Sequence, residues 1–151
     1  MASTVNELYK DNLVFTAYNA GVTTINAGEL VAAYNNQDAV TSKANLADTD
    51  LQIQTMNTLT EMFCVGIALE TIGTATVTTQ PPYGAVSTRG LYILRAGALS
   101  TAGVAITPIG GVDPAEVRTV YAYTSASWII GRALTGASAA DAYMVCILDV
   151  A

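Results

Sequence analysis

The side chains that could carry chemistry in this chain are few and widely spaced. Among its 12 Asp and Glu residues, Asp48 and Asp50 form the closest pair. A calcium loop would need a third ligand and an EF-hand-like Gly and Glu, which this segment lacks, so a solvated loop is the favoured interpretation. Glu29, Glu61 and Glu70 fall near the ends of expected strands. Any two of them at one site could act as a general acid and a general base, but nothing in their spacing indicates a shared site.

The absence of histidine excludes much of catalytic and metal chemistry. Without an imidazole there is no Ser-His-Asp triad, no Cys-His pair and no histidine ligand for a metal. The two cysteines, Cys64 and Cys146, lie inside apolar runs, which is typical of small buried hydrophobic side chains; whether they form a disulfide stays open. No phosphate-binding glycine motif and no nucleophile elbow is present. We therefore expect no enzyme, no cofactor and no metal site.

The composition narrows the class of partner. Of the 151 residues, 52% are hydrophobic and only 12% are charged, and the net charge is -6. This hydrophobicity argues against disorder, and the acidic balance argues against nucleic acid as a partner. The densest apolar stretch, 62–69, is far too short to cross a membrane as a helix. The first residues lack the basic and apolar regions of a signal peptide, so we expect synthesis in the cytoplasm and no membrane partner.

The elements that must position these residues are short β-strands. From residue 13 onward, β-branched and aromatic runs alternate with Gly, Pro and Asn turn signals, and a spacing of about ten residues is typical of a sandwich or barrel. The expected strands are 13–18, 29–34, 51–54, 62–69, 75–79, 91–95, 104–107, 117–123, 127–134 and 143–149. The polar segment 35–50 predicts a long loop. We expect an all-β fold, with one small barrel or sandwich-like domain over 13–151.

Residues 1–12 form a polar N-terminal arm ahead of that domain. Thr4-Val5-Asn6-Glu7 fits the capping-box pattern, which predicts a helical turn. Two interpretations of the arm stay open. It is either a mobile segment with a chance match to the motif, or an arm that orders on a neighbouring subunit, with Leu8 and Tyr9 as its apolar anchors.

A short motif occurs twice. Gly66-Ile67-Ala68-Leu69 matches Gly131-Arg132-Ala133-Leu134 when the two glycines are aligned. Glycine in a strand marks a bulge or the close approach of another backbone. Alanine two positions later points to the same face and keeps it shallow. We interpret the motif as a packing device that carries no chemistry.

The repeat extends beyond this motif. Ala27-Gly28 and Ala102-Gly103 each lead into a strand, and an apolar strand is expected after each Gly-x-Ala-Leu, at 75–79 and at 143–148. The first half is longer between these pieces, and the polar 35–50 loop can absorb the difference. Chance matching in an alanine-rich chain is the alternative. Because three pieces recur in the same order, we favour two related halves, which span approximately 13–80 and 84–151.

Four further residues are candidates for contacts with a partner. Arg89 and Arg95 bracket one expected strand at a spacing of six residues, so they face the same side. They would contact an acidic partner or, as the favoured alternative, form ordinary surface ion pairs. Tyr121 and Tyr123 share one face of another strand. If exposed they would anchor an interface, and if buried they would belong to the core.

From about residue 13 to its end, the chain resembles the capsid decoration, or capsid cement, proteins of tailed phages. The segments that carry the likeness are 27–31 (AGELV), 65–70 (VGIALE), 90–94 (GLYIL), 102–104 (AGV) and 130–134 (IGRAL). The resemblance implies a β-tulip-like domain that binds the major capsid protein on the outer surface of an icosahedral capsid, commonly as a homotrimer. It implies neither catalysis nor a cofactor nor a small-molecule substrate.

Two alternatives to a capsid cement protein stay open. The chain could be another virion component, such as the base of a head fibre, a minor coat protein or a tail-tube protein. It could also be a ligand-binding β-barrel or a small enzyme, for which the only support is a set of aromatic residues and the scattered carboxylates.

Overall fold

The computed structural model describes residues 7–10, 14–34, 51–56, 63–76, 78–109, 116–120 and 129–150, with the backbone alone for 7–10 and 116–120. Within these ranges the chain is all-β, as predicted, and contains no α-helix, so no helix there could cross a bilayer. The strands are β1 (Glu7–Lys10), β2 (Val14–Asn19), β3 (Leu30–Ala33), β4 (Leu51–Thr55), β5 (Cys64–Ala68), β6 (Tyr83–Ser87), β7 (Arg89–Ala96), β8 (Ala105–Pro108), β9 (Glu116–Val120), β10 (Gly131–Ala133) and β11 (Tyr143–Asp149).

Strands β2 to β6 form a closed barrel, the first ring, in the order β2-β4-β3-β5-β6. The β2–β4 pairing is parallel, and the other four pairings are antiparallel. Side chains alternate between the two sides of a strand, so one set from each strand points into the barrel. The apolar side chains that are fully buried in this ring are those of Ala17, Ile25, Val31, Ile53, Ala68, Ile72 and Val86.

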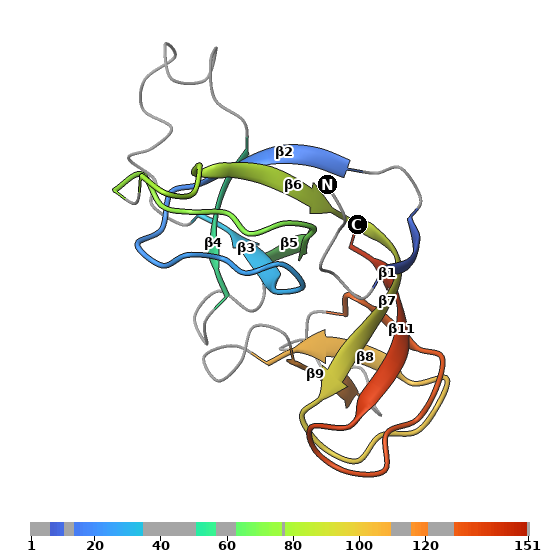
Figure 1. Ribbon diagram of the computed structural model, residues 1–151. Coiled ribbons are helices and arrows are strands. Elements are labelled where there is room, and N and C mark those ends of the chain that lie inside the picture. Colours follow the sequence, from blue (N-terminus) through green and yellow to red (C-terminus); the bar gives the residue numbers. More distant parts are fainter. Residues whose placement is uncertain are drawn as a thin grey trace.

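Strands β7 to β11 form a second ring. They belong to a sheet with the order β1-β7-β11-β10-β8-β9, and an additional pairing of β7 with β9 closes five of its strands. The β7–β9 pairing is parallel and the other four are antiparallel, which is the connectivity of the first ring. Figure 1 shows the first ring above the second, with β6 leading directly into β7. The join at Thr88 lies slightly later than the break predicted between residues 80 and 84.

The two rings also share their register. Gly66 lies opposite Val31 in the β3–β5 pairing, and Gly131 lies opposite Ile106 in the β8–β10 pairing. Val31 and Ile106 each lie three positions after the glycine of the Ala-Gly step in their half, and Gly66 and Gly131 each begin the repeated motif. Residues at corresponding positions of the two halves therefore form corresponding pairs in the two rings.

Backbone contacts outside the strands follow the same alignment of the two halves. The isolated bridge between Ile25 and Ile72 has a counterpart in the bridge between Ser100 and Ala137. Equivalent backbone hydrogen bonds include Gly28 N to Ala68 O with Gly103 N to Ala133 O, and Leu69 N to Ala85 O with Leu134 N to Val145 O.

Interior volume is distributed differently in the two rings. In the first ring, Ile25 and Ile72 are both fully buried and fill the end of the barrel beside Gly84. A Cβ at Gly84 would approach Cγ1 of Ile72 to 2.5 Å. The bulk of the two isoleucines thus requires glycine on the neighbouring strand, since a packed core leaves no space for an extra methyl group.

In the second ring the large and small side chains exchange places at the equivalent positions. Ser100 and Ala137 are small, and Met144 on β11 is buried beside them, where the first ring has glycine on β6. The Ser100 hydroxyl contacts the Met144 sulfur at 3.3 Å. The flexible methionine therefore fills the space that two isoleucines occupy in the first ring.

Two expectations about individual elements were wrong. Residues 75, 76, 78 and 79 form turns rather than a strand, and the last strand of the first ring is β6. The sequence Pro81-Pro82-Tyr83-Gly84 looks like a turn signal, but Tyr83 and Gly84 begin strand β6. Glycine stands at position 84 because Ile72 leaves no space for a side chain there. At the N-terminus, Glu7–Lys10 pairs with β7 as strand β1 and makes no helical turn.

Candidate interaction surface

Strand β7 places both predicted arginines on its outward face. Burial alternates along the strand, and Arg89, Leu91, Ile93 and Arg95 occupy the less buried side while the residues between them are buried. The prediction that the two arginines face the same side is therefore confirmed. Each arginine lies near one end of the strand, with apolar side chains between them.

Both arginines form ion pairs with the same chain. Arg89 Nε donates to Asp149 Oδ1 at 2.6 Å, directly across the β7–β11 pairing. Arg95 Nη1 lies 4.0 Å from Asp141 Oδ1, in the turn that leads into β11. Asp141 has a positive φ of 64°, a conformation that aspartate tolerates in turns. The favoured expectation of surface ion pairs is confirmed, whereas a contact with an acidic partner stays a prediction.

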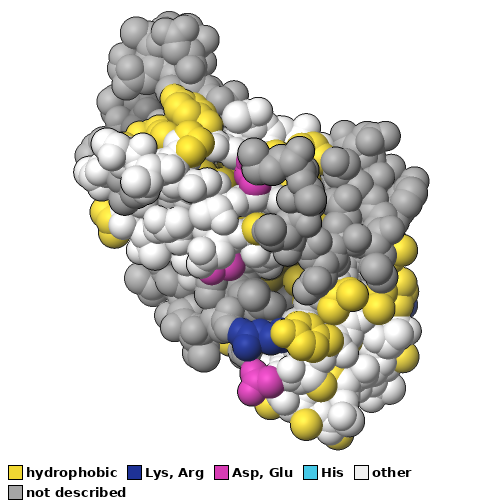
Figure 2. All heavy atoms as spheres, in the orientation of Figure 1, with side chains coloured by type: hydrophobic (Ala, Val, Ile, Leu, Met, Phe, Trp, Pro, Cys, Tyr) yellow, Lys and Arg dark blue, Asp and Glu magenta, His cyan; other side chains and the backbone are white. Residues whose placement is uncertain are grey.

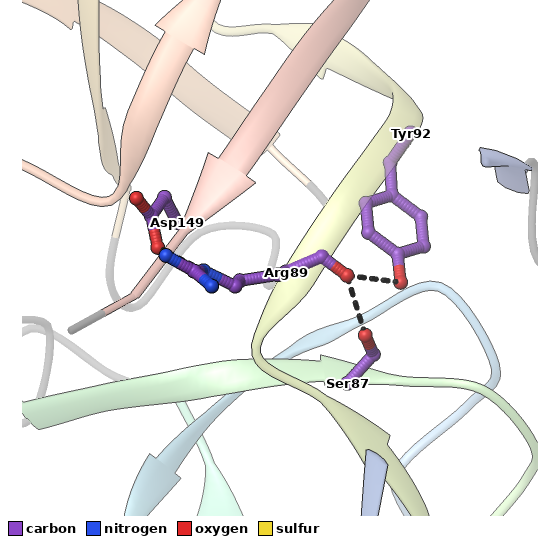
Figure 3. A network of polar contacts seen from close by, with 4 residues as sticks. All are labelled: Ser87, Arg89, Tyr92 and Asp149. Atoms are coloured by element: carbon purple, nitrogen blue, oxygen red, sulfur yellow. Dashed lines mark hydrogen bonds and ion pairs between the residues drawn. The ribbon is translucent and has the colours of Figure 1, made fainter. Parts of the chain in front are cut away.

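The Arg89 backbone is held at the join between the rings. Its carbonyl oxygen accepts hydrogen bonds from the Ser87 hydroxyl at 2.7 Å and from the Tyr92 hydroxyl at 3.3 Å, as Figure 3 shows. Next to it, Val150 N donates to Thr88 O at 3.0 Å. These bonds satisfy polar groups at the point where the chain passes from one ring to the other.

An apolar surface lies between the two ion pairs. On β11, Val145 and Ile147 pair with Ile93 and Leu91, and Leu134 donates its backbone N–H to Val145. Ile147 is 42% exposed and Leu134 46% exposed, while the other three are partly buried. We call these five residues the second-ring face. Figure 2 shows hydrophobic side chains at the surface in the lower part of the molecule, beside basic and acidic groups.

This surface has the composition of a protein interface. Interfaces commonly have an apolar centre and a polar rim, and here the rim charges of Arg89 and Arg95 are already neutralised by Asp149 and Asp141. The central residues of this surface were not among the predicted contact residues. Their signal was that β7 and β11 are apolar on both faces, as in Leu91-Tyr92-Ile93-Leu94, a pattern expected where both sides of a sheet are covered.

The other predicted contact residues have different outcomes. Leu8 and Tyr9 belong to β1, and the backbone of Tyr9 pairs with Leu91 of β7. The segment 7–10 therefore extends the sheet of its own chain. Tyr121 and Tyr123 lie outside the described residues, so their role as anchors stays a prediction.

The groups considered for catalysis have structural roles where the structure describes them. Glu29 accepts hydrogen bonds from Asn26 N and Nδ2, and Glu70 accepts one from Ala85 N at 2.8 Å. Glu61, Asp48 and the rest of 35–50 lie outside the described residues. Within the described ranges, no three acidic, cysteine or histidine residues gather as metal ligands would.

The two cysteines are core residues, as expected. Cys64 and Cys146 are buried free thiols in the same apolar cluster. Burial raises the pKa of each thiol to about 12. Both therefore stay protonated at neutral pH, where a thiol is a poor nucleophile.

A shallow depression of about 240 Å³ opens beside the β2–β3 loop and the end of β4. Its lining offers hydroxyl and amide groups but no ionisable side chain, and it consists of Gly21, Val22, Thr23, Gln54, Thr55 and Met56. The Thr55 hydroxyl there has no hydrogen-bond partner within the described part of the chain. Such a site suits a water molecule better than a reaction.

Similarity to a known protein is found at the level of structure and not of sequence. No protein-family model matches the chain, and no curated protein sequence matches it. Among solved structures, it is similar to the N base of the head fiber protein gp8.5 of bacteriophage phi29, with a TM-score of 0.50 at 15% sequence identity. The match covers 91% of this chain and 94% of that one. At this identity the likeness shows a shared fold over nearly the whole length of both chains.

Proposed function

We propose that this chain is a structural protein of a tailed-phage head, which binds the outer surface of the capsid and stabilises the lattice of the major capsid protein. The observation that carries the proposal is the fold shared with a phage head-fibre base over 91% of the chain. The residue patterns that resemble capsid decoration proteins point to the same class of virion component.

The chemistry of the chain supports a binding role rather than an enzymatic one. The chain has no histidine, and the described carboxylates that could act as acids or bases instead hold backbone and amide groups. A protein that binds only the assembled lattice stabilises it by mass action, without any catalytic group. Many copies on one shell add to this effect when each bridges neighbouring capsomers. In this role the partners are the major capsid protein and other copies of the chain, as a homotrimer.

The base of a head fibre is a second candidate, since the similar structure is itself such a base. The two candidates differ in where and how densely the protein lies on the particle. A cement protein covers the head and stabilises it, whereas a fibre base need only attach at fibre positions and leaves the stability of the shell unchanged.

The test is co-sedimentation of the purified chain with capsids of the phage that encodes it. We expect binding to expanded capsids, little binding to the precursor shell, and a higher melting temperature of the loaded particle. Tyr121→Ser with Tyr123→Ser should weaken binding, whereas the loop control Thr76→Ala should not. Binding without stabilisation of the particle would favour the fibre base. The proposal would be overturned if the chain binds neither shell, or if a label on this chain appears only on the tails of virions.

A further inference from the structure

We propose that this chain meets the capsid through its second ring. The second-ring face and Arg132 contact a surface of the shell that is apolar and carries a carboxylate, and the first ring is turned toward the solution. This inference rests on the proposed function and deepens it, because it assigns the contact surface and the chemistry of the partner. It is carried by the distribution of charge along the chain, the size of the side chains on the face, and a cation beside them.

Charge is divided unequally between the two halves of the chain. The segment 11–88, which contains β2 to β6, has seven acidic residues and one lysine, so its net charge is -6. The segment 89–151, which contains β7 to β11, has four acidic residues and four arginines and is neutral. Taking unpaired charges out of water is costly. The neutral half is therefore better suited to a protein contact, and the acidic half to the solvent.

The second-ring face carries larger apolar side chains than the equivalent surface of the first ring. Ile67 pairs with Ser87 as Arg132 pairs with Ile147, which aligns the strands of the two rings. The cross-strand pairs of the face and their counterparts are Leu91–Ile147 with Val14–Ser87, and Ile93–Val145 with Thr16–Ala85.

At all four of these positions the second ring has the larger apolar residue. Val14 and Thr16 are exposed to solvent in the first ring, and there the chain keeps a valine and a threonine where the second ring has Leu91 and Ile93. A contiguous apolar patch on a protein surface marks an interaction site. The difference between the rings thus indicates that a partner covers the second-ring face.

Arg132 adds a positive charge to this face. It lies directly opposite Ile147 in the β10–β11 pairing, and Leu134, two residues later, points to the same side. Arg132 is exposed, and its Nη1 donates to the carbonyl oxygen of Gly103 at 3.3 Å. In the described part of the chain no carboxylate forms an ion pair with it, whereas both arginines of β7 are paired. The face therefore has one cation that a partner can neutralise.

These features define the surface that fits. It is apolar opposite the second-ring face and has a carboxylate opposite Arg132, because arginine forms strong, directional hydrogen bonds with carboxylates. A second copy in a symmetric contact would bring two Arg132 side chains into one interface, and like charges oppose such a contact. Tyr143 lies two residues before Val145, on the same side of β11, and is 64% exposed. Tyrosine is a common anchor of interfaces, so Tyr143 extends the contact.

The test is co-sedimentation with expanded capsids of the phage that encodes the chain, over a concentration series. We expect Ile147→Glu and Arg132→Glu each to raise the dissociation constant about tenfold or more, since each brings an unmatched negative charge into the contact. Arg132→Lys keeps the positive charge and should weaken binding less than Arg132→Glu. Val22→Glu is the matched control, because it adds the same charge at a first-ring loop residue that is 97% exposed. Thermal unfolding followed by circular dichroism verifies that each variant is folded.

Oxidative footprinting tests the orientation on the unmodified chain, without any substitution. Tyr143 and Tyr83 occupy equivalent positions at the start of β11 and β6, and they are 64% and 43% exposed. Binding to the capsid should lower the rate of Tyr143 oxidation several-fold and leave that of Tyr83 unchanged.

Failure of the inference is distinguishable from failure of the proposed function. If the unmodified chain binds neither shell, both fall. If it binds but Ile147→Glu and Arg132→Glu bind equally well, or if Tyr83 is protected instead of Tyr143, the inference alone is overturned. It is also overturned if sedimentation equilibrium shows that Ile147→Glu changes the oligomeric state of the free chain, because the face would then lie between copies.

Discussion

The carbonyl oxygen of Ile147 occupies the space where any side chain at Gly131 would begin. This oxygen belongs to the backbone of β11, which pairs with β10 at this point, so it cannot move without disturbing the ring. The first ring repeats the relationship, because a Cβ at Gly66 would meet the carbonyl of Ser87. The two glycines of the repeated motif thus mark the same close approach of strands in each ring.

Gly131→Ala should lower the free energy of unfolding by roughly 1–3 kcal/mol, the range for forcing an extra methyl group into a packed site. The control is Gly103→Asn. Gly103 has a φ of 85° but nothing within 4 Å of an added Cβ, and asparagine tolerates this conformation. Urea denaturation of the two variants measures the difference. Equal losses for both would contradict a steric role for Gly131.

The packing of Gly84 against Ile72 predicts a coupled pair. Gly84→Ala alone should destabilise the first ring by roughly 1–3 kcal/mol, because the new Cβ collides with the Ile72 side chain. Ile72→Ala alone should destabilise it by roughly 2–5 kcal/mol through a cavity. The double variant should be more stable than the sum of the two losses predicts, as a double-mutant cycle measures. Simple additivity would show that the two side chains do not share this space.

The ion pair between Arg89 and Asp149 should contribute little to stability. Its side chains are 44% and 56% exposed, and exposed pairs typically contribute about 0.2–1 kcal/mol. A double-mutant cycle with Arg89→Gln and Asp149→Asn should give a coupling energy in that range, and about 1 M salt should remove most of it. A coupling of several kcal/mol that resists salt would indicate a buried pair instead.

The buried cysteines should be unreactive in the folded chain. Cys64 and Cys146 are enclosed in the apolar core, and burial raises the pKa of both thiols to about 12. A thiol reagent at pH 8 should therefore modify neither residue until denaturant is added, when both should react. Rapid labelling of the native protein would mean that this core opens on the timescale of the reaction.

The same pKa shifts predict a loss of stability at high pH. Because the folded state holds the thiol protons more tightly than the unfolded chain does, this contribution is complete below the ordinary thiol pKa of 9.0 and is lost as the pH rises toward 12. The limiting slope is about 1.4 kcal/mol per pH unit for each thiol. Cys64→Ala with Cys146→Ala should flatten this part of the pH profile, measured by urea denaturation. An unchanged slope would assign the effect to other groups.

Much of the strand pattern was predictable from local sequence. The alternation in Leu51-Gln52-Ile53-Gln54 predicts β4, and the turn signals around Gly28 and Gly103 predict where β3 and β8 begin. Strand β6 was missed because glycine and proline are read as breakers. Only its neighbour Ile72, from an earlier part of the chain, explains why glycine stands at position 84.

The candidate surface was predictable only in part. The spacing of Arg89 and Arg95 placed them on one face, and their acidic partners then came from a strand and a turn far along the chain. The apolar residues between the arginines could not be assigned to a side, because β7 is apolar on both faces and either face could have turned inward.

By itself, the sequence determined the class of the fold, the repeated Gly-x-Ala-Leu motif with the Ala-Gly step that precedes each copy, and the lack of histidine chemistry. The tertiary structure decided that each half closes into a ring and that Leu69 is covered while its counterpart Leu134 is exposed. The reason is physical. Apolar alternation along a segment favours a strand locally, whereas ring closure, the covering of an outer face and the glycine at position 84 depend on contacts between residues far apart in the chain.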